Sequence, residues 1–233
     1  MELSKRLQAV ADLVSSGLTV ADVGTDHGYI PIYLVEIGKC AKAFAMDVNE
    51  GPILRAQDHI MEHGLNEQIE TRLSDGVKGL QVGECDAVVI AGMGGALTVK
   101  ILEEGQAVFQ NLKEFILQPQ SELYKVREFL VSQGYCVIQE EMVKEDGKFY
   151  PMMKVIRRES EEYSTVELRY GKLLLTEKHP ILKEFLMKEK NTKKIILQNL
   201  QKESGFHIEV RKNEIMEELE EIEYALQRYY EGD

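Results

Sequence analysis

The chain has 233 residues, which is enough for one large domain or for one domain with a small appendage. Its formal net charge of −12 excludes a protein that coats nucleic acid nonspecifically, although an RNA enzyme with a local basic face remains compatible with it. No apolar stretch approaches transmembrane length and no apolar core follows the first residues, so we expect neither a membrane span nor a signal peptide.

Helical and strand patterns alternate from residue 1 to about residue 157. Helices are expected at 3–16, 29–38, 51–63 and 96–110 and from Ser121 as N-cap, and strands at 18–23, 40–47, 69–73, 86–91 and 114–118. Two further strands, 135–143 and 149–157, flank a short polar loop with Asp-Gly, which predicts an antiparallel hairpin. The order predicts an α/β fold with a Rossmann-like, mostly parallel sheet and one antiparallel edge strand.

The turn after the first strand reads Asp22-Val-Gly-Thr-Asp-His-Gly28. Glycine lets a ligand approach the backbone, and the following helix points its free N–H groups at the same place. Asp47 ends the next strand, where a carboxylate can accept hydrogen bonds from a ribose diol. Turn and acid together predict a nucleoside-bearing cofactor. The alternative is that Gly24 and Gly28 only make a tight turn.

The identity of the cofactor follows from what the turn lacks. A dinucleotide fingerprint has a glycine two positions after the first one, and here that position is Asp26. A carboxylate there would repel a pyrophosphate but suits an ammonium group, such as the methionine end of S-adenosylmethionine. Asp26 is also the best candidate for a carboxylate near the transferred methyl group, although we favour the role in ammonium binding. For His27 the alternative to cofactor binding is that it only orients the turn.

Glycine-rich backbone follows the fourth strand, at Ala91-Gly-Met-Gly-Gly95. Many amino-methylating enzymes hold their amine there with an Asn/Asp-Pro-Pro-aromatic motif, and here no side-chain acceptor is present. The exposed carbonyls and the open space would suit a flat base, so the catalytic group is predicted to comprise Gly92, Met93 and Gly94 with Asp26. The alternative is a glycine turn that only starts the next helix.

Composition changes near residue 159, after which Leu, Ile, Glu and Lys dominate. Residues 1–159 are expected to form the catalytic domain and residues 160–233 a helical coiled-coil domain. Apolar residues recur at coiled-coil spacing at Ile215, Leu219, Ile222 and Leu226. The stretch from Lys178 to Lys194 is basic in an otherwise acidic chain, so phosphate contacts are predicted for Lys183, Lys190, Lys193 and Lys194. A solvated helix surface is the alternative, and a second basic patch is possible at the hairpin near Lys148.

The motifs in their order closely resemble the bacterial tRNA adenine-N1 methyltransferases that act on adenine 22. The resemblance rests on residues 3–7, 22–31, 74–76, 91–95 and Gln118-Pro119, and it covers the whole chain. It implies a class I methyltransferase fold, S-adenosylmethionine as methyl donor, tRNA as substrate and a C-terminal coiled coil. Gln120 is a departure, because asparagine is often found at that position.

The expected site combines these arguments. Asp75 is expected to contact the adenine amino group of the cofactor, and Gly76 to permit its approach. The predicted cofactor-binding residues are Asp22, Gly24, Thr25, Asp26, His27, Gly28, Asp47, Val48, Asp75, Gly76, Ala91 and Gly92. The predicted substrate-binding residues are Arg6, Tyr29, Tyr150, Lys183, Lys190, Lys193 and Lys194. The alternative for Tyr29 is a core position on the buried face of its helix, which suits it equally well.

Other expectations concern metal, redox state and rival functions. His59 and His63 have the spacing of a metal pair but lack a third ligand, so no metal is expected. The three cysteines, Cys40, Cys85 and Cys136, are far apart in the sequence, which indicates reduced thiols in a cytoplasmic protein. We also expect the protein to be a monomer.

A methyltransferase for a protein or small molecule would share every cofactor motif and is the main rival. A nicotinamide oxidoreductase lacks its fingerprint here, and a silent RNA-binding scaffold is the remaining alternative.

Overall fold

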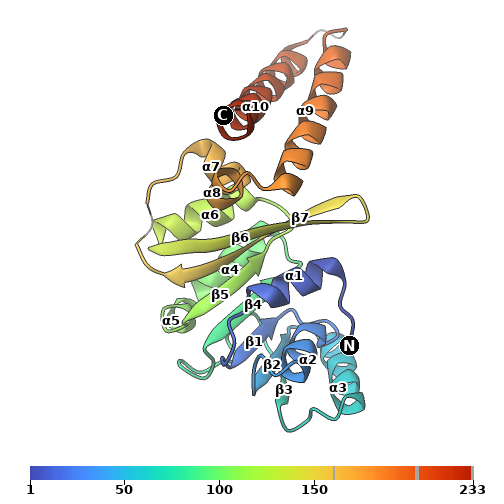
Figure 1. The fold of residues 1–233 in the computed structure, drawn as a ribbon, viewed down its shortest axis with the longest axis vertical. Helices are drawn as coiled ribbons and strands as arrows, with labels where there is room; N and C mark the ends of the chain where they lie inside the picture. Colours follow the sequence, from blue (N-terminus) through green and yellow to red (C-terminus); the bar gives the residue numbers. More distant parts are fainter. Residues whose placement is uncertain (160, 203–204, 232–233) are drawn as a thin grey trace. The chain divides into compact units, whose positions relative to one another are not determined.

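The computed structural model describes residues 1–159, 161–202 and 205–231, so both ends of the expected domain 160–233 lie outside the described residues. The chain divides into two compact units, Met1–Glu162 and Tyr163–Asp233 (Figure 1). Within the described ranges, no helix combines the length and apolarity needed to cross a membrane.

The first unit alternates strands and helices in the predicted order. Its strands are β1 (Val20–Val23), β2 (Ala43–Asp47), β3 (Ile69–Leu73), β4 (Ala87–Ala91), β5 (Glu114–Gln118), β6 (Tyr135–Glu145) and β7 (Lys148–Arg157). Its helices are α1 (Lys5–Leu13), α2 (Tyr29–Glu36), α3 (Glu50–Glu62), α4 (Gly95–Glu104), α5 (Gln106–Phe109) and α6 (Leu123–Ser132). Gly105 ends α4 and divides the expected helix 96–110 into α4 and α5, and its backbone packs so closely against Val77 and Phe109 that a side chain would not fit.

The seven strands form one sheet in the order β3-β2-β1-β4-β5-β7-β6. β1 pairs in parallel with β2 and β4, and β4 pairs in parallel with β5. β7 runs antiparallel to both β5 and β6, so the hairpin closes this edge of the sheet. The predicted Rossmann-like sheet with its antiparallel edge is therefore confirmed. Strand order reverses at β1 and β4, and such a switch point at the carboxyl ends of the strands is where α/β sheets bind ligands.

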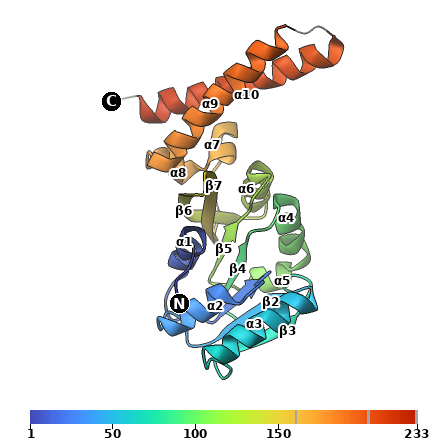
Figure 2. The same cartoon turned by 90° about the vertical axis from the view of Figure 1, so that its right-hand side faces the viewer.

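Two helical layers cover the sheet, and Figure 2 shows α1 and α4 on opposite sides of β4 and β5. One core cluster joins α1, α2 and α3 to the central strands through buried aliphatic residues, among them Val10, Ile32, Ile60 and Val89. On the other layer Phe109 and Phe115 meet edge to face, with ring centroids 5.2 Å apart, and Phe115 meets Tyr135 in the same way. Strands buried on both faces account for the continuous apolar runs of the sequence.

One capping prediction was wrong. Ser121 does not cap the helix that follows it, since the N-cap of α6 is Glu122. Instead Ser121 Oγ accepts a hydrogen bond from Gly95 N at 3.2 Å, and Glu122 accepts one from Ala96 N at 3.1 Å. Both side chains therefore satisfy free N–H groups at the start of α4, a helix far away in sequence.

The second unit contains α7 (Thr165–Tyr170), α8 (Lys172–Thr176), α9 (Pro180–Leu200) and α10 (Phe206–Tyr230). Ser164 and Glu167 form a capping box at the start of α7. Pro180 begins α9, where a backbone N–H would have no partner within the helix, so its absence loses no hydrogen bond. The apolar residues that the spacing picked out on α10, Ile215, Leu219, Ile222 and Leu226, are all buried. Leu182 and Leu186 of α9 are buried as well, and α9 packs against α10.

Candidate active site

The turn after β1 is fixed to the neighbouring strand. Gly24 N and Thr25 N both donate to Met46 O of β2, at 2.8 and 3.0 Å. Gly24 has a φ of +81°, a left-handed conformation that residues with a Cβ rarely adopt. The turn thus presents bare backbone at the switch point of the sheet, beside the start of α2.

Asp22 lies buried beneath this turn, with 4% of its surface exposed. Burial raises the pKa of the Asp22 carboxyl from 3.8 to about 6, and the negative charge of Asp47 adds to the increase. The Thr25 hydroxyl and the Arg6 guanidinium act in the opposite direction. The carboxylate is thus more costly to ionise in the folded protein than in the unfolded chain.

This pKa predicts a pH-dependent contribution to stability. The contribution of Asp22 is fully present below pH 3.8 and is lost as the pH rises through about 6, because the ionised form is favoured in the unfolded chain. Asp22→Asn should therefore gain stability relative to the wild type by about 2 kcal/mol between pH 4.5 and pH 7.5. Urea unfolding at both pH values measures the change, with Asp58→Asn on the exposed face of α3 as control. An equal difference at both pH values would contradict the assignment.

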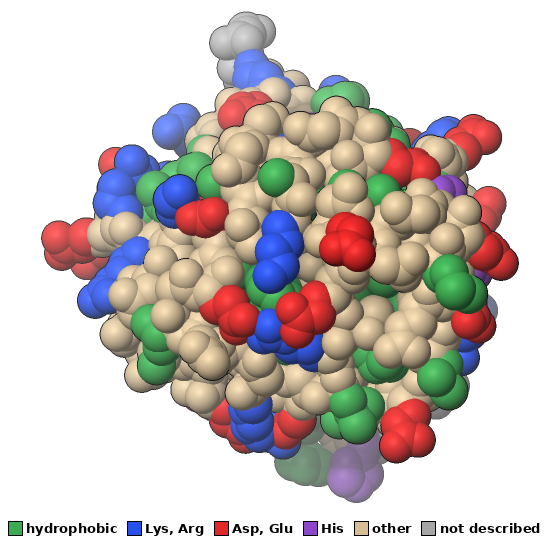
Figure 3. Space-filling view, turned by 90° about the horizontal axis from the view of Figure 1, so that it is seen from below, with side chains coloured by type: hydrophobic (Ala, Val, Ile, Leu, Met, Phe, Trp, Pro, Cys, Tyr) green, Lys and Arg blue, Asp and Glu red, His purple; other side chains and the backbone are tan. Residues whose placement is uncertain are grey.

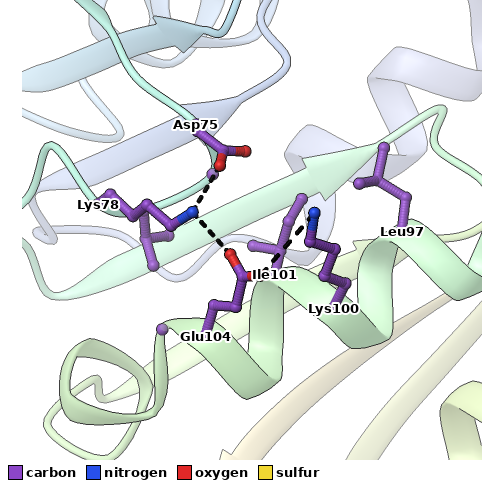
Figure 4. Close-up of a pocket in the computed structure, with 9 residues that line it drawn as sticks. Asp75, Lys78, Leu97, Lys100, Ile101 and Glu104 are labelled. Carbon is purple, nitrogen blue, oxygen red and sulfur yellow. Dashed lines mark hydrogen bonds and ion pairs between the residues drawn. The ribbon is translucent and has the colours of Figure 1, made fainter.

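Two further carboxylates lie at the same edge of the sheet, one at the end of β2 and one in the turn after β3. Asp47 Oδ1 accepts a hydrogen bond from Asn49 N at 2.8 Å, which fixes the carboxylate at the strand end. Asp75 lies in the turn after β3, and its Oδ2 is 2.5 Å from Lys78 Nζ. In Figure 4, Lys78 lies between Asp75 and Glu104, whose Oε2 is 2.7 Å from the same nitrogen. The ion pair with Lys78 holds the pKa of Asp75 below its usual value.

Asp47→Ala tests the predicted ribose contact. Loss of charge-assisted hydrogen bonds to a diol should weaken S-adenosylmethionine binding at least about tenfold, which corresponds to about 1.5–3 kcal/mol. Thermal unfolding should show the fold intact, because Asp47 is only partly buried. Calorimetry measures the affinity, and an unchanged value would place the ribose elsewhere.

Asp26, His27 and Tyr29 lie together on the outer side of the turn. Asp26 has a φ of +44°, and its Oδ1 accepts a hydrogen bond from Arg55 Nη2 at 2.5 Å. The rings of His27 and Tyr29 stack with centroids 5.1 Å apart, and His59 stacks on both. The sequence did not single out Arg55, whose partner is 29 residues away. The roles of Asp26, His27 and Tyr29 in binding stay predictions.

The glycine-rich segment after β4 is tied to the segment that follows β5. Gly92 N donates to Gln118 O at 3.0 Å, and Gln120 N donates to Met93 O at 2.8 Å. Gly92 has a φ of +83°, and a Cβ there would lie 3.5 Å from Arg6 Nη1 and 3.8 Å from Gln120 Nε2. The side chains of Arg6 and Gln120 therefore lie against the backbone of Gly92.

Arg6 and Tyr150 lie together beside Gly92 although 144 positions separate them in the sequence. The guanidinium of Arg6 lies 5.8 Å from the centroid of the Tyr150 ring, and its Nη1 donates to Gln118 Oε1 at 3.0 Å. Gln118 is fully buried and was not predicted as a site residue, although its position at the end of β5 is a signal for one. The structure thus brings together Arg6, Gly92, Gln118 and Tyr150.

The four lysines predicted to contact phosphates lie on α9, where each has a partner within the second unit. Lys193 Nζ lies 2.5 Å from Glu218 Oε2, and Lys190 and Lys194 both approach Glu223 Oε1, at 3.0 and 3.3 Å. Lys183 lies over the Tyr230 ring at 5.7 Å. Glutamates of α10 therefore offset much of the positive charge that the α9 sequence carries.

Basic residues of the first unit lie close to acidic ones in two places. Lys154 of the hairpin is largely buried and pairs with Glu114 at 2.9 Å, so it does not extend the expected hairpin patch. On the face shown in Figure 3, lysine and arginine side chains lie among aspartates and glutamates. Among the residues described, no cluster of three or more His, Cys, Asp or Glu side chains could hold a metal ion.

The chain is similar in sequence to known proteins. Residues 3–153 match the family described as "Methyltransferase domain". The tRNA (adenine(22)-N(1))-methyltransferase of Bacillus subtilis (strain 168) is 38% identical over 192 residues, which cover 82% of this chain and 77% of that protein.

Two solved structures resemble the whole chain. Streptococcus pneumoniae Sp1610 in complex with S-adenosyl-L-methionine is 33% identical, with a TM-score of 0.87 and coverage of 97% of this chain and 100% of that one. M. capricolum TrmK in complex with S-adenosyl-homocysteine is 27% identical, with a TM-score of 0.86 and coverage of 98% and 100%. The likeness therefore extends through both units.

Proposed function

The chain belongs to the family of the tRNA (adenine(22)-N(1))-methyltransferases, and from this membership we propose that it transfers a methyl group from S-adenosylmethionine to N1 of adenine 22 in tRNA. The observation that carries the proposal is the extent of the similarity, which includes the turn after β1, the glycine-rich segment after β4 and the helical unit. A methyltransferase for a protein or small molecule would share the first two features, and the third favours tRNA.

The residues at the switch point fit the cofactor. The bare backbone of Gly24 allows close approach, and Asp47 can accept hydrogen bonds from the ribose hydroxyls. We propose that Asp75, in the turn after β3, contacts the adenine amino group and that Gly76 beside it permits the approach. We propose that Asp22, Thr25, Asp26, His27, Gly28, Val48, Ala91 and Gly92 complete this site.

S-adenosylmethionine supplies a methyl group that its sulfonium already activates. Adenine N1 carries an in-plane lone pair, so its attack on the methyl carbon breaks the carbon–sulfur bond with no proton to remove. The chain therefore needs no strong general base, and its task is to hold the base in line with the methyl group. We propose that Gly92, Met93 and Gly94 leave room for the flat base and that the carbonyl of Gly92 faces its amino group, where it stabilises the developing positive charge. The other two carbonyls already accept hydrogen bonds, Met93 O from Gln120 N and Gly94 O from Thr98 N.

Arg6 and Tyr150 are proposed to hold the substrate at the mouth of this site. Their side chains already lie together, so little ordering is required when RNA binds. Arg6 can hold a phosphate next to the target nucleotide, and Tyr150 or Tyr29 can stack on an unpaired base. Phosphate contacts by Lys183, Lys190, Lys193 and Lys194 remain part of the proposal, although RNA would have to compete with Glu218 and Glu223 for three of them.

Further parts of the proposal concern the protein as a whole. Residues 1–159 are assigned the catalytic role and residues 160–233 the role of an RNA-holding coiled-coil domain. The protein is proposed to act as a cytoplasmic monomer without metal. Size-exclusion chromatography with light scattering tests the oligomeric state, and dialysis against a chelator should leave activity unchanged.

Nucleoside analysis tests the reaction. The protein is incubated with isotopically labelled S-adenosylmethionine and unmodified bulk tRNA, and the tRNA is then digested to nucleosides. We expect the label in N1-methyladenosine. Label in methylated guanosine or cytidine would overturn the assignment, and label only in protein or in small molecules would favour the rival function.

A further inference from the structure

The side chain of Met93 lies against the backbone of Gly24. A Cβ added at Gly24 would overlap Met93 Cε, and Met93 Sδ would lie 4.0 Å away from it. The end of the methionine side chain thus occupies the space that the absence of a side chain at Gly24 leaves open. This space is also where a cofactor would approach the turn after β1.

The backbones on both sides of this contact are fixed. Gly24 N is hydrogen bonded to Met46 O of β2, and Met93 O accepts a hydrogen bond from Gln120 N. The start of α4 is also tied to Ser121 and Glu122. Any opening of the space over Gly24 must therefore come from the Met93 side chain.

Met93 is well suited to such a movement. Methionine is unbranched with three rotatable side-chain bonds, so it can change conformation without displacing the backbone. Its neighbours Gly92 and Gly94 have no side chains to obstruct the rotation. Met93 itself is only partly buried, so the side chain has a solvent-facing direction in which to turn.

We propose that the Met93 side chain is a gate that closes over Gly24 in the free protein and turns away when the cofactor binds. This inference rests on the proposed function, because it takes the turn after β1 as the site of S-adenosylmethionine. Only molecules with an open gate can bind the cofactor. The apparent association rate constant is therefore the intrinsic rate constant multiplied by the open fraction.

Methyl NMR tests the gate directly in the full chain. The nine methionines are labelled with ¹³C at their methyl groups, and the Met93 signal is identified by its absence in Met93→Leu. We expect a nuclear Overhauser contact between the Met93 methyl group and the Gly24 α-protons in the free protein, and its loss when S-adenosylhomocysteine saturates the site. A contact that persists at saturation would overturn the gate and leave the proposed function intact. Failure of the wild type to bind S-adenosylhomocysteine in calorimetry would overturn both.

Association kinetics supply the second readout. Met93→Ala should associate with S-adenosylhomocysteine at least about threefold faster than the wild type, as expected if the gate is closed for about two-thirds of the time. Met61→Ala, at an exposed methionine of α3, should leave the rate unchanged. Surface plasmon resonance measures both rates. A rate for Met93→Ala equal to that of the wild type would contradict the gate.

Discussion

Gly24→Ala is expected to abolish S-adenosylmethionine binding and, with it, tRNA methylation, with an affinity loss of about a hundredfold or more. The φ of +81° makes any residue with a Cβ strained at this position, at a cost of about 1–2 kcal/mol. Overlap with Met93 Cε adds little, because a flexible side chain can move away. The larger effect comes from the new methyl group on the backbone face that the cofactor must approach. Calorimetry measures the loss.

Gly17→Ala is the matched control for this strain. Gly17 has the same φ of +81°, and a Cβ there would meet no atom within 4 Å. Both variants should therefore lose similar stability in thermal unfolding, whereas only Gly24→Ala should lose cofactor binding. If Gly17→Ala lost binding to the same degree, general destabilisation would explain the effect. Wild-type affinity in Gly24→Ala would move the cofactor away from this turn.

Removal of the second unit should abolish tRNA methylation while cofactor binding is kept. A chain that ends at Glu162 contains the whole sheet and every residue proposed to contact the cofactor. It has 16 basic and 26 acidic side chains, so it offers little attraction for a polyanion. A nucleotide within folded tRNA must be held through the surrounding shape and backbone. We therefore expect at least about a hundredfold lower methylation of tRNA, which corresponds to about 2.7 kcal/mol of lost transition-state stabilisation.

Two measurements on the shortened chain separate the possible outcomes. Calorimetry with S-adenosylmethionine should give an affinity close to that of the full chain, which shows that the sheet has folded. Methylation assays with tRNA then report the contribution of the second unit. Full activity on tRNA would show that the helical unit does not hold RNA and would shift that role to Arg6, Tyr150 and the hairpin.

The sheet could be predicted from sequence because its signals are local. Continuous apolar runs such as Ala87–Ala91 mark strands that are buried on both faces, and the Asp-Gly loop marks the hairpin. The helix after Ser121 shows the limit of this reasoning. A serine before a helical pattern is a usual N-cap signal, yet Ser121 binds Gly95 N of α4. Which of two nearby helix starts a side chain satisfies depends on tertiary packing.

The candidate site likewise contains residues that local sequence patterns identify and contacts that depend on tertiary packing. Asp22 and Asp47 lie at or near the carboxyl ends of β1 and β2 and Gly24 directly follows β1, so the order of strands was sufficient to place them at one edge. The contact of Arg6 with Gln118 and Tyr150 joins a helix and two strands that no local pattern connects. The pairing of Lys193 with Glu218 depends likewise on how α10 packs against α9. A sequence count of charges does not show that these lysines are paired.

The most direct measurement compares two tRNA transcripts that differ only at nucleotide 22. One carries adenine at this position and the other guanine, and each is incubated with the protein and labelled S-adenosylmethionine. Mass spectrometry of nuclease fragments then locates the methyl group. We expect one methyl group on the fragment that contains adenine 22, recovered as N1-methyladenosine, and none on the guanine transcript. Equal methylation of both transcripts, or a methyl group on any other nucleotide, would contradict the proposed function.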